Sequence, residues 1–438
     1  MTTRRKTWLG IGVAAMAGAA LPTVPAAHAV PGIHAPEPAT STSDAARAER
    51  RMMIAQAASK GGGEGSDGEA GEIQSYALAS TDPNAFKYDA RDEIAAYAKG
   101  VQASYAASAA AARTMATAID AMLAKPNATT LAAARKAWVA ARPAYLVTEA
   151  YRFYDGPIED IEGEVNAWPM NEAFIDYVEG DPKAGIINDK SDLSIAQLLV
   201  KNGASDESDV TLGWHAIEFL LWGQDLNANG PGARPASDYV AGKGNNDRRR
   251  QYLKLVTERL VANLGRLGGS WRAGVPDNYA ATFQALEPRE AIGRIFNGMA
   301  VLAGFELMSE RMAVALDSGD QEDEHSCFSD TTHQDFVYDL KGIETVWTGT
   351  YPNAAGPGMR GLVARLDKAL AAEVDGLFAD ASAKTAQLGD PWDKVLASKP
   401  GSQGRKDGEA AVEALGKLAD GLKRAGNKLG VLVQIPSA

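Results

Sequence analysis

Residues 90–124 read ARDEIAAYAKGVQASYAASAAAARTMATAIDAMLA, and this stretch decides the fold class. Alanine is the strongest helix former, and it dominates the stretch. The larger apolar side chains recur at steps of three and four residues, at Ile94, Tyr97, Val101 and Tyr105. Because that spacing places them on one helical face, the stretch predicts a long amphipathic helix that packs against other helices.

The helical pattern continues toward the C-terminus. Asn127 and the threonines at 129–130 interrupt the first helix and supply a cap for a second one, which extends to Phe153. Further helices are predicted at 192–202, 209–222, 246–272, 287–317, 331–348, 358–388 and 407–434. Alternating β-branched runs are almost absent. We therefore predict an all-α protein of two helical bundles, residues 88–285 and 286–438, with a cleft between them.

Two segments of the chain resemble each other, residues 215–223 and residues 341–349. Each contains an Ile-Glu pair that is followed by a glycine at the same distance. The match predicts an internal duplication. Since Lys341 stands where the first segment has His215, the two copies cannot carry out the same metal chemistry.

The N-terminus has the pattern of a secretory signal peptide over residues 1–29. Basic residues Arg4 to Lys6 precede the apolar stretch Trp8 to Pro22, and Ala27-His28-Ala29 forms a small-x-small cleavage site. The pattern predicts a periplasmic or otherwise extracytoplasmic protein, soluble after cleavage. It leaves the general and twin-arginine export routes open.

Residues 30–87 are rich in Gly, Ser, Pro and Ala and contain few aromatic side chains. Such a segment buries too little apolar surface to offset the entropy lost on ordering. We predict a flexible tether between the signal peptide and the first bundle.

The composition excludes several classes of protein. Lys and Arg total 44 against 56 Asp and Glu, which gives a net charge of −12 without a basic stripe, so nucleic-acid binding is excluded. The single cysteine, Cys327, excludes an internal disulfide, a zinc site built on paired thiolates and a Cys-x-x-Cys-His haem attachment. Any metal site must therefore depend on five histidines and on carboxylates.

The segment 213–225 reads GWHAIEFLLWGQD and contains the first candidate site. On a helix, His215 and Glu218 share one face, and an imidazole beside a carboxylate suits a divalent metal ion such as iron or zinc. The alternative is a structural pair that forms hydrogen bonds inside the core. Two ligands are in either case only half of a metal site.

The segment 324–335 reads EHSCFSDTTHQD and contains the second candidate. Ser329 or Asp330 is predicted to cap a helix that starts near residue 331, with His333 in its first turn. Asp330 and His333 are possible additional metal ligands. The alternative is a polar loop that fixes how the bundles cross.

Three carboxylates on predicted helices complete the set of possible ligands, namely Glu149, Glu306 and Glu310. Glu149 follows Arg142 at a helical spacing and precedes Arg152 by three residues, so it fits an ion pair as well as a ligand. The glutamates at 306 and 310 are four apart on an otherwise apolar helix. They are ligands if they face His215, and ordinary charged side chains otherwise.

Three motifs resemble the imelysin family, and most closely its iron-regulated protein A branch. They are Gly213-x-His215-x-x-Glu218 with its Trp-Gly-x-Asp continuation, Trp138-x-x-x-Arg142, and His325-Ser-Cys-Phe-Ser-Asp-x-x-His333. The resemblance covers the chain from about residue 88 to the C-terminus. It implies two helical bundles, duplicated from one another, with a site where they meet. Many relatives have a lipid anchor, whereas this chain lacks the cysteine that such an anchor needs.

The family is extracytoplasmic and associated with iron uptake, and its proposed metal site corresponds to His215 and Glu218. The resemblance thus implies a protein that binds iron, as a divalent or ferric ion or as an iron-bearing ligand; the sequence does not support haem. A metallopeptidase is the alternative implied by the family's name, although two local ligands are fewer than the three of a catalytic zinc site. A metal-free module that binds an outer-membrane or envelope protein is a third hypothesis.

Overall fold

The computed structural model describes residues 76–78, 88–227, 230–389 and 391–436. These residues belong to one compact unit, Glu72–Pro436. The predicted signal peptide lies outside the described residues, and so does the predicted tether apart from the strand Tyr76–Leu78.

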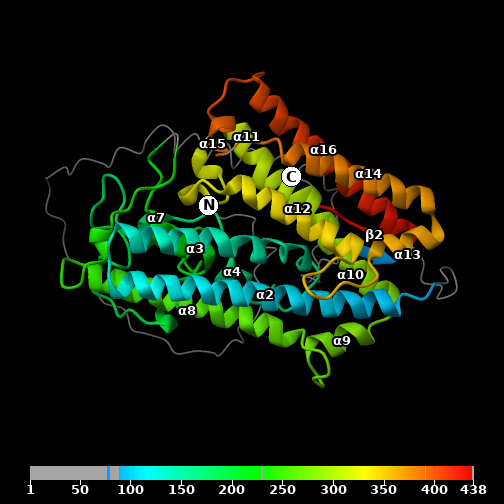
Figure 1. The fold of residues 1–438 in the computed structure, drawn as a ribbon, viewed down its shortest axis with the longest axis horizontal. Coiled ribbons are helices and arrows are strands. Elements are labelled where there is room, and N and C mark those ends of the chain that lie inside the picture. The colour runs from blue at the N-terminus through cyan, green and yellow to red at the C-terminus, as the bar shows by residue number, and fades with distance from the viewer. Residues whose placement is uncertain (1–75, 79–87, 228–229, 390, 437–438) are drawn as a thin grey trace, which may run out of the picture. The chain divides into compact units, whose positions relative to one another are not determined.

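The unit consists of helices and one short antiparallel pair of strands (Figure 1). The elements in chain order are β1 (Tyr76–Leu78), α2 (Arg91–Ala124), α3 (Ala128–Leu146), η1 (Glu149–Tyr151), α4 (Glu162–Val165), α5 (Glu172–Ile175), α6 (Ile195–Lys201), α7 (Gly213–Trp222), η2 (Ala236–Tyr239), α8 (Asn246–Ser270), α9 (Tyr279–Ala285), α10 (Pro288–Val301), η3 (Leu302–Ala313), α11 (Val314–Ser318), η4 (Gln321–Asp323), η5 (Cys327–Ser329), α12 (Thr332–Thr348), α13 (Met359–Leu366), α14 (Lys368–Thr385), α15 (Asp393–Leu396), α16 (Gln403–Lys428) and β2 (Val431–Val433). Almost all regular structure among the described residues is thus helical, as the sequence predicts.

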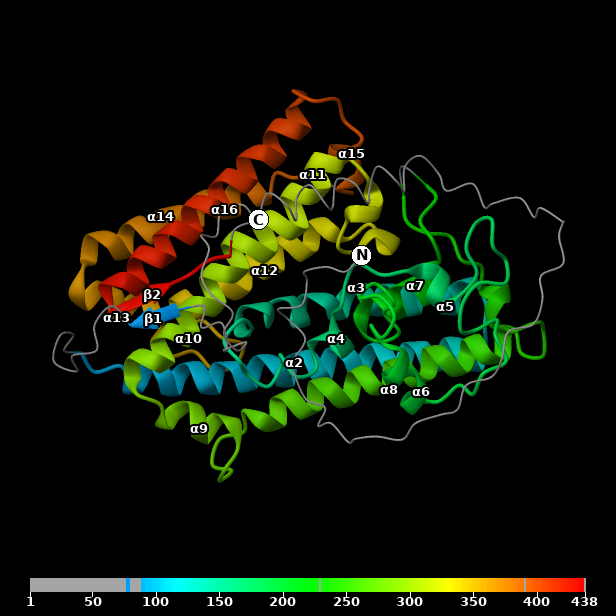
Figure 2. The same ribbon diagram turned by 180° about the vertical axis from the view of Figure 1, so that it is seen from behind.

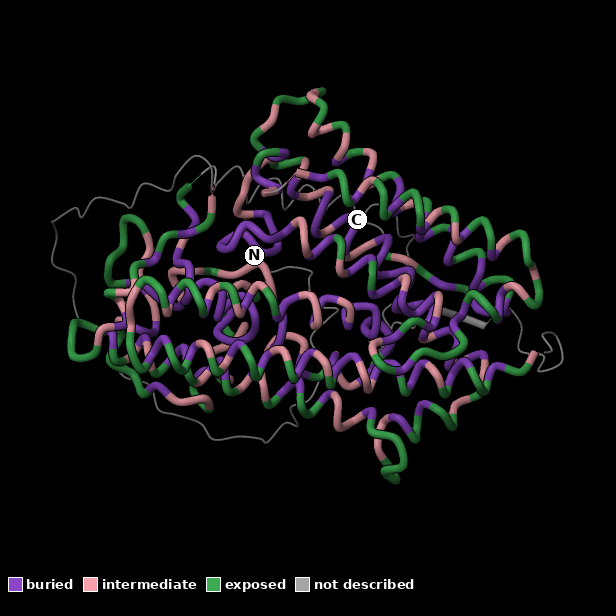
Figure 3. Tube along the Cα trace, viewed as in Figure 1, coloured by how far each residue is buried: buried purple, intermediate pink, exposed green. Residues whose placement is uncertain are grey.

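The N-terminal helices pack around α2. This helix contacts α3 and α8 along its length, and α7 packs between α3 and α8 (Figure 1). The predicted break and cap are confirmed, because the side chain of Asn127 accepts hydrogen bonds from the amides of Thr129 and Thr130. The apolar face of α2 is buried at Ile94, Tyr97, Val101 and Tyr105, and Figure 3 shows the buried stripe along the helices.

The C-terminal helices pack around one continuous helical segment, Pro288–Ser318. Its central part, η3, is a π-helix, and it packs against α16, which in turn packs against α14 (Figure 2). The segment is long and apolar enough to cross a membrane, but 78% of its most hydrophobic window is buried inside the protein. Its composition is therefore that of a core helix.

The last predicted helix, 407–434, is wrong at its C-terminal end. The helix α16 ends at Lys428, and Val431–Val433 forms the strand β2, which pairs with β1. The partner Tyr76–Leu78 belongs to the segment predicted as a tether. Three residues alone carry no detectable strand pattern, so neither strand could be predicted.

The duplication, the inter-bundle cleft and the boundary between residues 285 and 286 stay predictions. The repeated Glu lies in different surroundings in the two segments. Lys341 and Glu344 form a 2.6 Å ion pair in which both side chains are at least one-third exposed, whereas His215 and Glu218 are both buried.

The helix α12 joins the two groups of helices by packing closely on α3. Gly342 makes this approach possible, because a Cβ atom at this position would lie 2.6 Å from the carbonyl oxygen of Val147. Gly376, in the middle of α14, has open space around it instead. The two glycines therefore form a matched pair for a packing test.

We predict that Gly342→Ala destabilises the protein by about 1–3 kcal/mol, because the added methyl group overlaps the backbone. Gly376→Ala should stabilise it by about 0.5–1 kcal/mol, because alanine loses less conformational entropy in a helix. Urea unfolding followed by circular dichroism measures both. A Gly342→Ala protein as stable as wild type would contradict the close packing of α12 on α3.

Candidate functional site

His215 and Glu218 lie in the first turns of α7, a helix whose ten residues are all buried. Gly213 starts this helix with φ 92° against the backbone of Val165, and a Cβ atom there would lie 2.6 Å from the Val165 carbonyl oxygen. The glycine of the Gly-x-His-x-x-Glu motif is therefore needed where the chain turns into the helix. The three-residue spacing then brings His215 Nδ1 to 2.9 Å from Glu218 Oε2.

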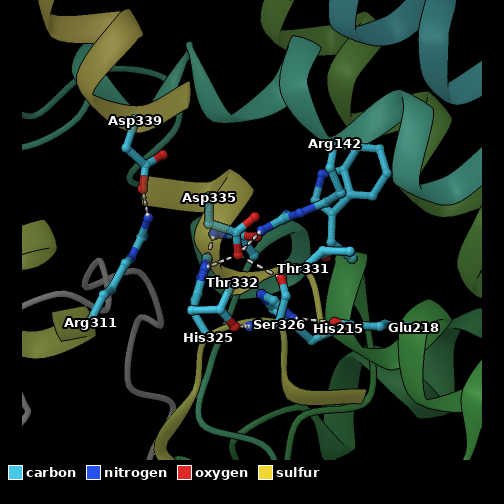
Figure 4. A network of polar contacts seen from close by, with 12 residues as sticks. Arg142, His215, Glu218, Arg311, His325, Ser326, Thr331, Thr332, Asp335 and Asp339 are labelled. Carbon is cyan, nitrogen blue, oxygen red and sulfur yellow. Dashed lines mark hydrogen bonds and ion pairs between the residues drawn. The ribbon is translucent and has the colours of Figure 1, made fainter. Parts of the chain in front are cut away.

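The second oxygen of Glu218 contacts the segment 324–335. Ser329 donates to Glu218 Oε1 from its backbone amide, at 3.0 Å, and from its hydroxyl, at 2.6 Å. Both carboxyl oxygens are thus occupied, one by Ser329 and one by His215, which Figure 4 shows beside Glu218. The sequence predicted Ser329 or Asp330 as a helix cap; this is wrong, because α12 begins at Thr332 and Ser329 binds Glu218.

A second histidine, His325, lies against the first. The two imidazole rings are 4.6 Å apart between centroids, with an interplanar angle of 65°. His325 Nδ1 lies 2.7 Å from Asp335 Oδ2, and Ser326 donates its hydroxyl to the same oxygen at 2.6 Å. Figure 4 shows His325, Ser326 and Asp335 together beside His215. Each histidine therefore has its Nδ1 atom fixed by a buried carboxylate.

The Nε2 atoms of His215 and His325, unlike their Nδ1 atoms, contact no carboxylate in the described part of the chain. His215 Nε2 is buried and has no hydrogen-bond partner among the described residues. His325 Nε2 has one long contact, 3.4 Å to the side-chain amide nitrogen of Asn166. A histidine whose Nδ1 is bound to a carboxylate and whose Nε2 is open has the arrangement typical of a metal ligand.

The electrostatic surroundings keep both rings neutral. Burial, and then the proximity of His325 and Arg142, lower the pKa of His215 well below its ordinary value. Burial, and then Arg311 and Arg142, lower the pKa of His325 in the same way. Burial raises the pKa of Glu218 to about 8. Neutral imidazole is the form that binds metal ions, and it binds through the nitrogen that carries no proton. Nε2 of His215 is that nitrogen when Glu218 is ionised and accepts the Nδ1 proton.

Arg142 lies above three aromatic rings and orients the neighbouring polar groups. Its guanidinium carbon is 5.5–5.6 Å from the ring centres of Trp138, Tyr145 and Trp214. It donates to Asn166 Oδ1 at 2.7 Å, and it contacts Asp335 at 3.5 Å. The Trp138-x-x-x-Arg142 motif therefore supports the two histidines from the α3 side, through Asn166 and Asp335.

The predicted additional ligands do not join His215. Glu149 is buried in ion pairs of 2.6 Å with Arg152 and with Arg311. These arginines hold the pKa of Glu149 below its ordinary value in spite of its burial. Glu306 also pairs with Arg311, at 3.0 Å. The ion-pair alternative stated for Glu149 thus describes it in this structure. Glu306, expected to be either a ligand or an ordinary charged side chain, belongs to the same group of ion pairs.

The remaining three predicted ligands lie elsewhere. Glu310 is half-buried on η3, and His333 is half-buried on α12. Asp330 lies with Asp225 and Asp393, and their oxygens are within 4.8 Å of one another. Among the described residues, this is the one group of three or more His, Cys, Asp or Glu side chains close enough to share an ion.

Sequence patterns did not single out His325, Asp335 or Asn166 as parts of the site. The sequence analysis names His325 within the segment 324–335 and at the start of a family motif, but not as an individual ligand. Its partners come from α4's C-terminal end and from α12. The His-Ser-Cys-Phe-Ser-Asp-x-x-His motif was the signal that could have found it, since the motif contains both His325 and Ser329.

The comparisons with known proteins identify the family and the fold. The Imelysin family model matches residues 101–422, which include both histidines, and the chain belongs to the imelysin family. No curated protein matches the sequence.

Two solved structures have the same fold. One is described as an iron-regulated protein A precursor from Parabacteroides distasonis ATCC 8503; it is 19% identical, with a TM-score of 0.61 over 80% of this chain and 98% of that one. The other is an imelysin-like protein from Psychrobacter arcticum 273-4; it is 16% identical, with a TM-score of 0.59 over 80% of this chain and 99% of that one. At these identities the likeness shows the fold.

The raised pKa of Glu218 predicts how the free energy of unfolding changes with pH. Between pH 4.5 and about 8 the folded protein retains a proton that the unfolded chain has lost, so this group lowers stability as the pH rises through that window. Glu218→Gln cannot ionise but preserves the shape and the acceptor for Ser329. We expect the wild type to lose roughly 3–5 kcal/mol relative to this variant between pH 4.5 and 8.

Urea unfolding of both proteins in a chelator at a series of pH values measures this difference. Asp380→Asn, which changes an exposed carboxylate on α14, is the control and should follow the wild type. A constant difference between wild type and Glu218→Gln across the window would show that Glu218 is ionised throughout.

Proposed function

We propose that this imelysin-family protein is an extracytoplasmic binding protein for iron, in which His215 and His325 bind the metal through their Nε2 atoms. The observation that supports this most strongly is the pair of adjacent neutral imidazoles, each held at Nδ1 by a buried carboxylate. Imidazole is a ligand that iron, zinc and copper accept.

In this proposal Glu218 and Asp335 orient the histidines rather than bind the metal. Both oxygens of Glu218 are already engaged, by His215 and by Ser329. Carboxylates that hold the far nitrogen of a metal-bound histidine fix its tautomer and raise its basicity. The motif glutamate is thereby given a specific task, different from the direct ligand role expected from the sequence.

Two imidazoles leave most coordination positions of an iron ion open. Among the described residues, no further His, Cys, Asp or Glu ligand atom forms a compact set with them. We therefore propose that the remaining ligands arrive with the metal, as in a small iron chelate. The printed description of one structural neighbour as iron-regulated, together with the predicted signal peptide, supports iron as the metal and the cell envelope as the location.

The experiments below also distinguish this proposal from the two alternatives, a metallopeptidase and a metal-free module that binds a protein partner. A peptidase would need Glu218 free to activate water, which its two occupied oxygens do not favour. A binding module for an envelope protein would need neither histidine for its function.

We predict that His215→Ala and His325→Ala each lower the affinity for iron by at least tenfold. Calorimetric titration of the purified protein with ferrous ion and with ferric citrate measures this affinity, and zinc serves as the competing ion. His333→Ala removes a histidine from the same segment and should bind iron as the wild type does. Glu218→Gln and Asp335→Asn, which keep the shape of the site, should weaken binding by about 10–100-fold.

Iron affinity unchanged in both His215→Ala and His325→Ala, with circular dichroism showing folded proteins, would overturn the proposal. Peptide hydrolysis that chelator and Glu218→Gln both abolish would establish the peptidase instead. If the protein binds no iron and captures an envelope protein equally well with and without His215, the metal-free module is the function.

A further inference from the structure

A second cluster of carboxylates lies buried near the C-terminal end of α7. Asp225 follows α7, Asp330 follows η5, and Asp393 begins α15. Their side-chain oxygens lie within 4.8 Å of one another, and the three residues are 3–6% exposed. Three segments distant in the sequence thus bring negative charge to one point inside the protein.

Glu324 adds a fourth carboxylate to this cluster. It is fully buried, and burial followed by the neighbouring carboxyl group of Asp393 raises the pKa of Glu324 well above its ordinary value. Apart from the other carboxyl groups of the cluster, no group among the described residues donates a hydrogen bond to Asp393 or to Asp225 Oδ2. Glu324 has the hydroxyl of Thr332 and the carboxyl group of Asp393 as neighbours, and neither carries a positive charge. Such unpartnered buried oxygens are costly unless a cation meets them.

Two other buried carboxylates of the protein have arginine partners. Asp176 contacts Arg234 and Arg249, each at 2.6 Å. Asp339 contacts Arg311 at 2.6 Å, as Figure 4 shows. In the described part of the chain, no lysine or arginine pairs with Asp225, Glu324 or Asp393. Asp176 and Asp339 are thus matched with arginine, whereas Asp225, Glu324 and Asp393 are not.

A cavity gives access to the cluster from the surface. It has a volume of about 540 Å³, and Asp225 lies in its wall together with Asp320 and Glu322. An acidic entrance raises the local concentration of cations and repels anions. The cavity therefore provides a path along which a hydrated metal ion can reach Asp225.

We propose that Asp225, Asp330 and Asp393, with Glu324 beside them, form a binding site for a hard divalent cation of the Ca²⁺ type. All four side chains offer oxygen, the ligand that Ca²⁺ prefers over nitrogen or sulfur. Oxygens bound to one Ca²⁺ ion at about 2.3–2.6 Å can be up to about 5 Å apart, which agrees with the separation in the cluster. The site is independent of the two histidines and of the proposed iron binding.

The cation would connect two segments that build the histidine site with a third from the C-terminal part of the chain. Asp225 lies three residues after the helix of His215, and Asp330 directly follows Ser329, the partner of Glu218. Asp393 belongs to the C-terminal part of the chain. An ion at this point stabilises the contact between these segments without touching the histidines.

We predict that Ca²⁺ raises the melting temperature of the full chain, by about 4 °C at a hundredfold excess over its Kd. Terbium(III), an analogue of Ca²⁺, should luminesce on excitation of tryptophan, because Trp392 adjoins Asp393. Asp225→Asn and Asp393→Asn should lose both effects. Because each variant also removes a repelling charge, it should remain folded without the ion.

Two controls separate this site from others. Asp380→Asn, an exposed carboxylate paired with Lys384, should respond to Ca²⁺ as the wild type does. His215→Ala should also keep the full Ca²⁺ response, even where iron binding is lost. A melting temperature that Ca²⁺ does not change in the wild type, or an equal Ca²⁺ response in wild type, Asp225→Asn and Asp393→Asn, would overturn the proposal.

Discussion

The burial of Glu218 is the constraint on which the rest of the site depends. A carboxyl group inside a fully buried helix must find hydrogen-bond partners, because an unsatisfied buried polar group is costly whether it is protonated or ionised. It finds them in His215, one helical turn earlier, and in Ser329, which lies more than a hundred residues later. This pairing holds the segment 324–335 against α7 and thereby brings His325 beside His215. The close contact of the two imidazoles is therefore a consequence of satisfying one acid.

The neighbouring buried charges also have partners. Arg142 bridges Asn166 and Asp335, while Arg311 joins Glu149 on η1 to Asp339 on α12. Arg311 belongs to the π-helical part of the long core helix, a kind of helix that is rare and is often found at functional sites. Burial first, and then Arg142 and Arg311, lower the pKa values of both histidines and keep the rings neutral, the form that binds a metal. Arg311 also forms ion pairs with Glu149 and Glu306, which the sequence analysis names as possible metal ligands.

The helices could be predicted from the sequence because each depends on local spacing. The apolar steps of α2 and the cap at Asn127 are decided within a few residues, and the structure has both. The short strands could not be predicted, since their pairing joins Tyr76–Leu78 to Val431–Val433 at opposite ends of the described chain. At the site, the contact between His215 and Glu218 follows from their spacing. The contacts of His325 and Ser329 depend on tertiary packing, and the sequence shows only that a polar segment is present.

X-ray absorption at the iron edge, recorded on the iron-loaded protein, tests the central claim most directly. The account predicts two imidazole ligands per iron, recognised by scattering from the outer atoms of the rings, and one such ligand after replacement of either His215 or His325. A coordination shell made of oxygen alone, or a spectrum that both replacements leave unchanged, would contradict it.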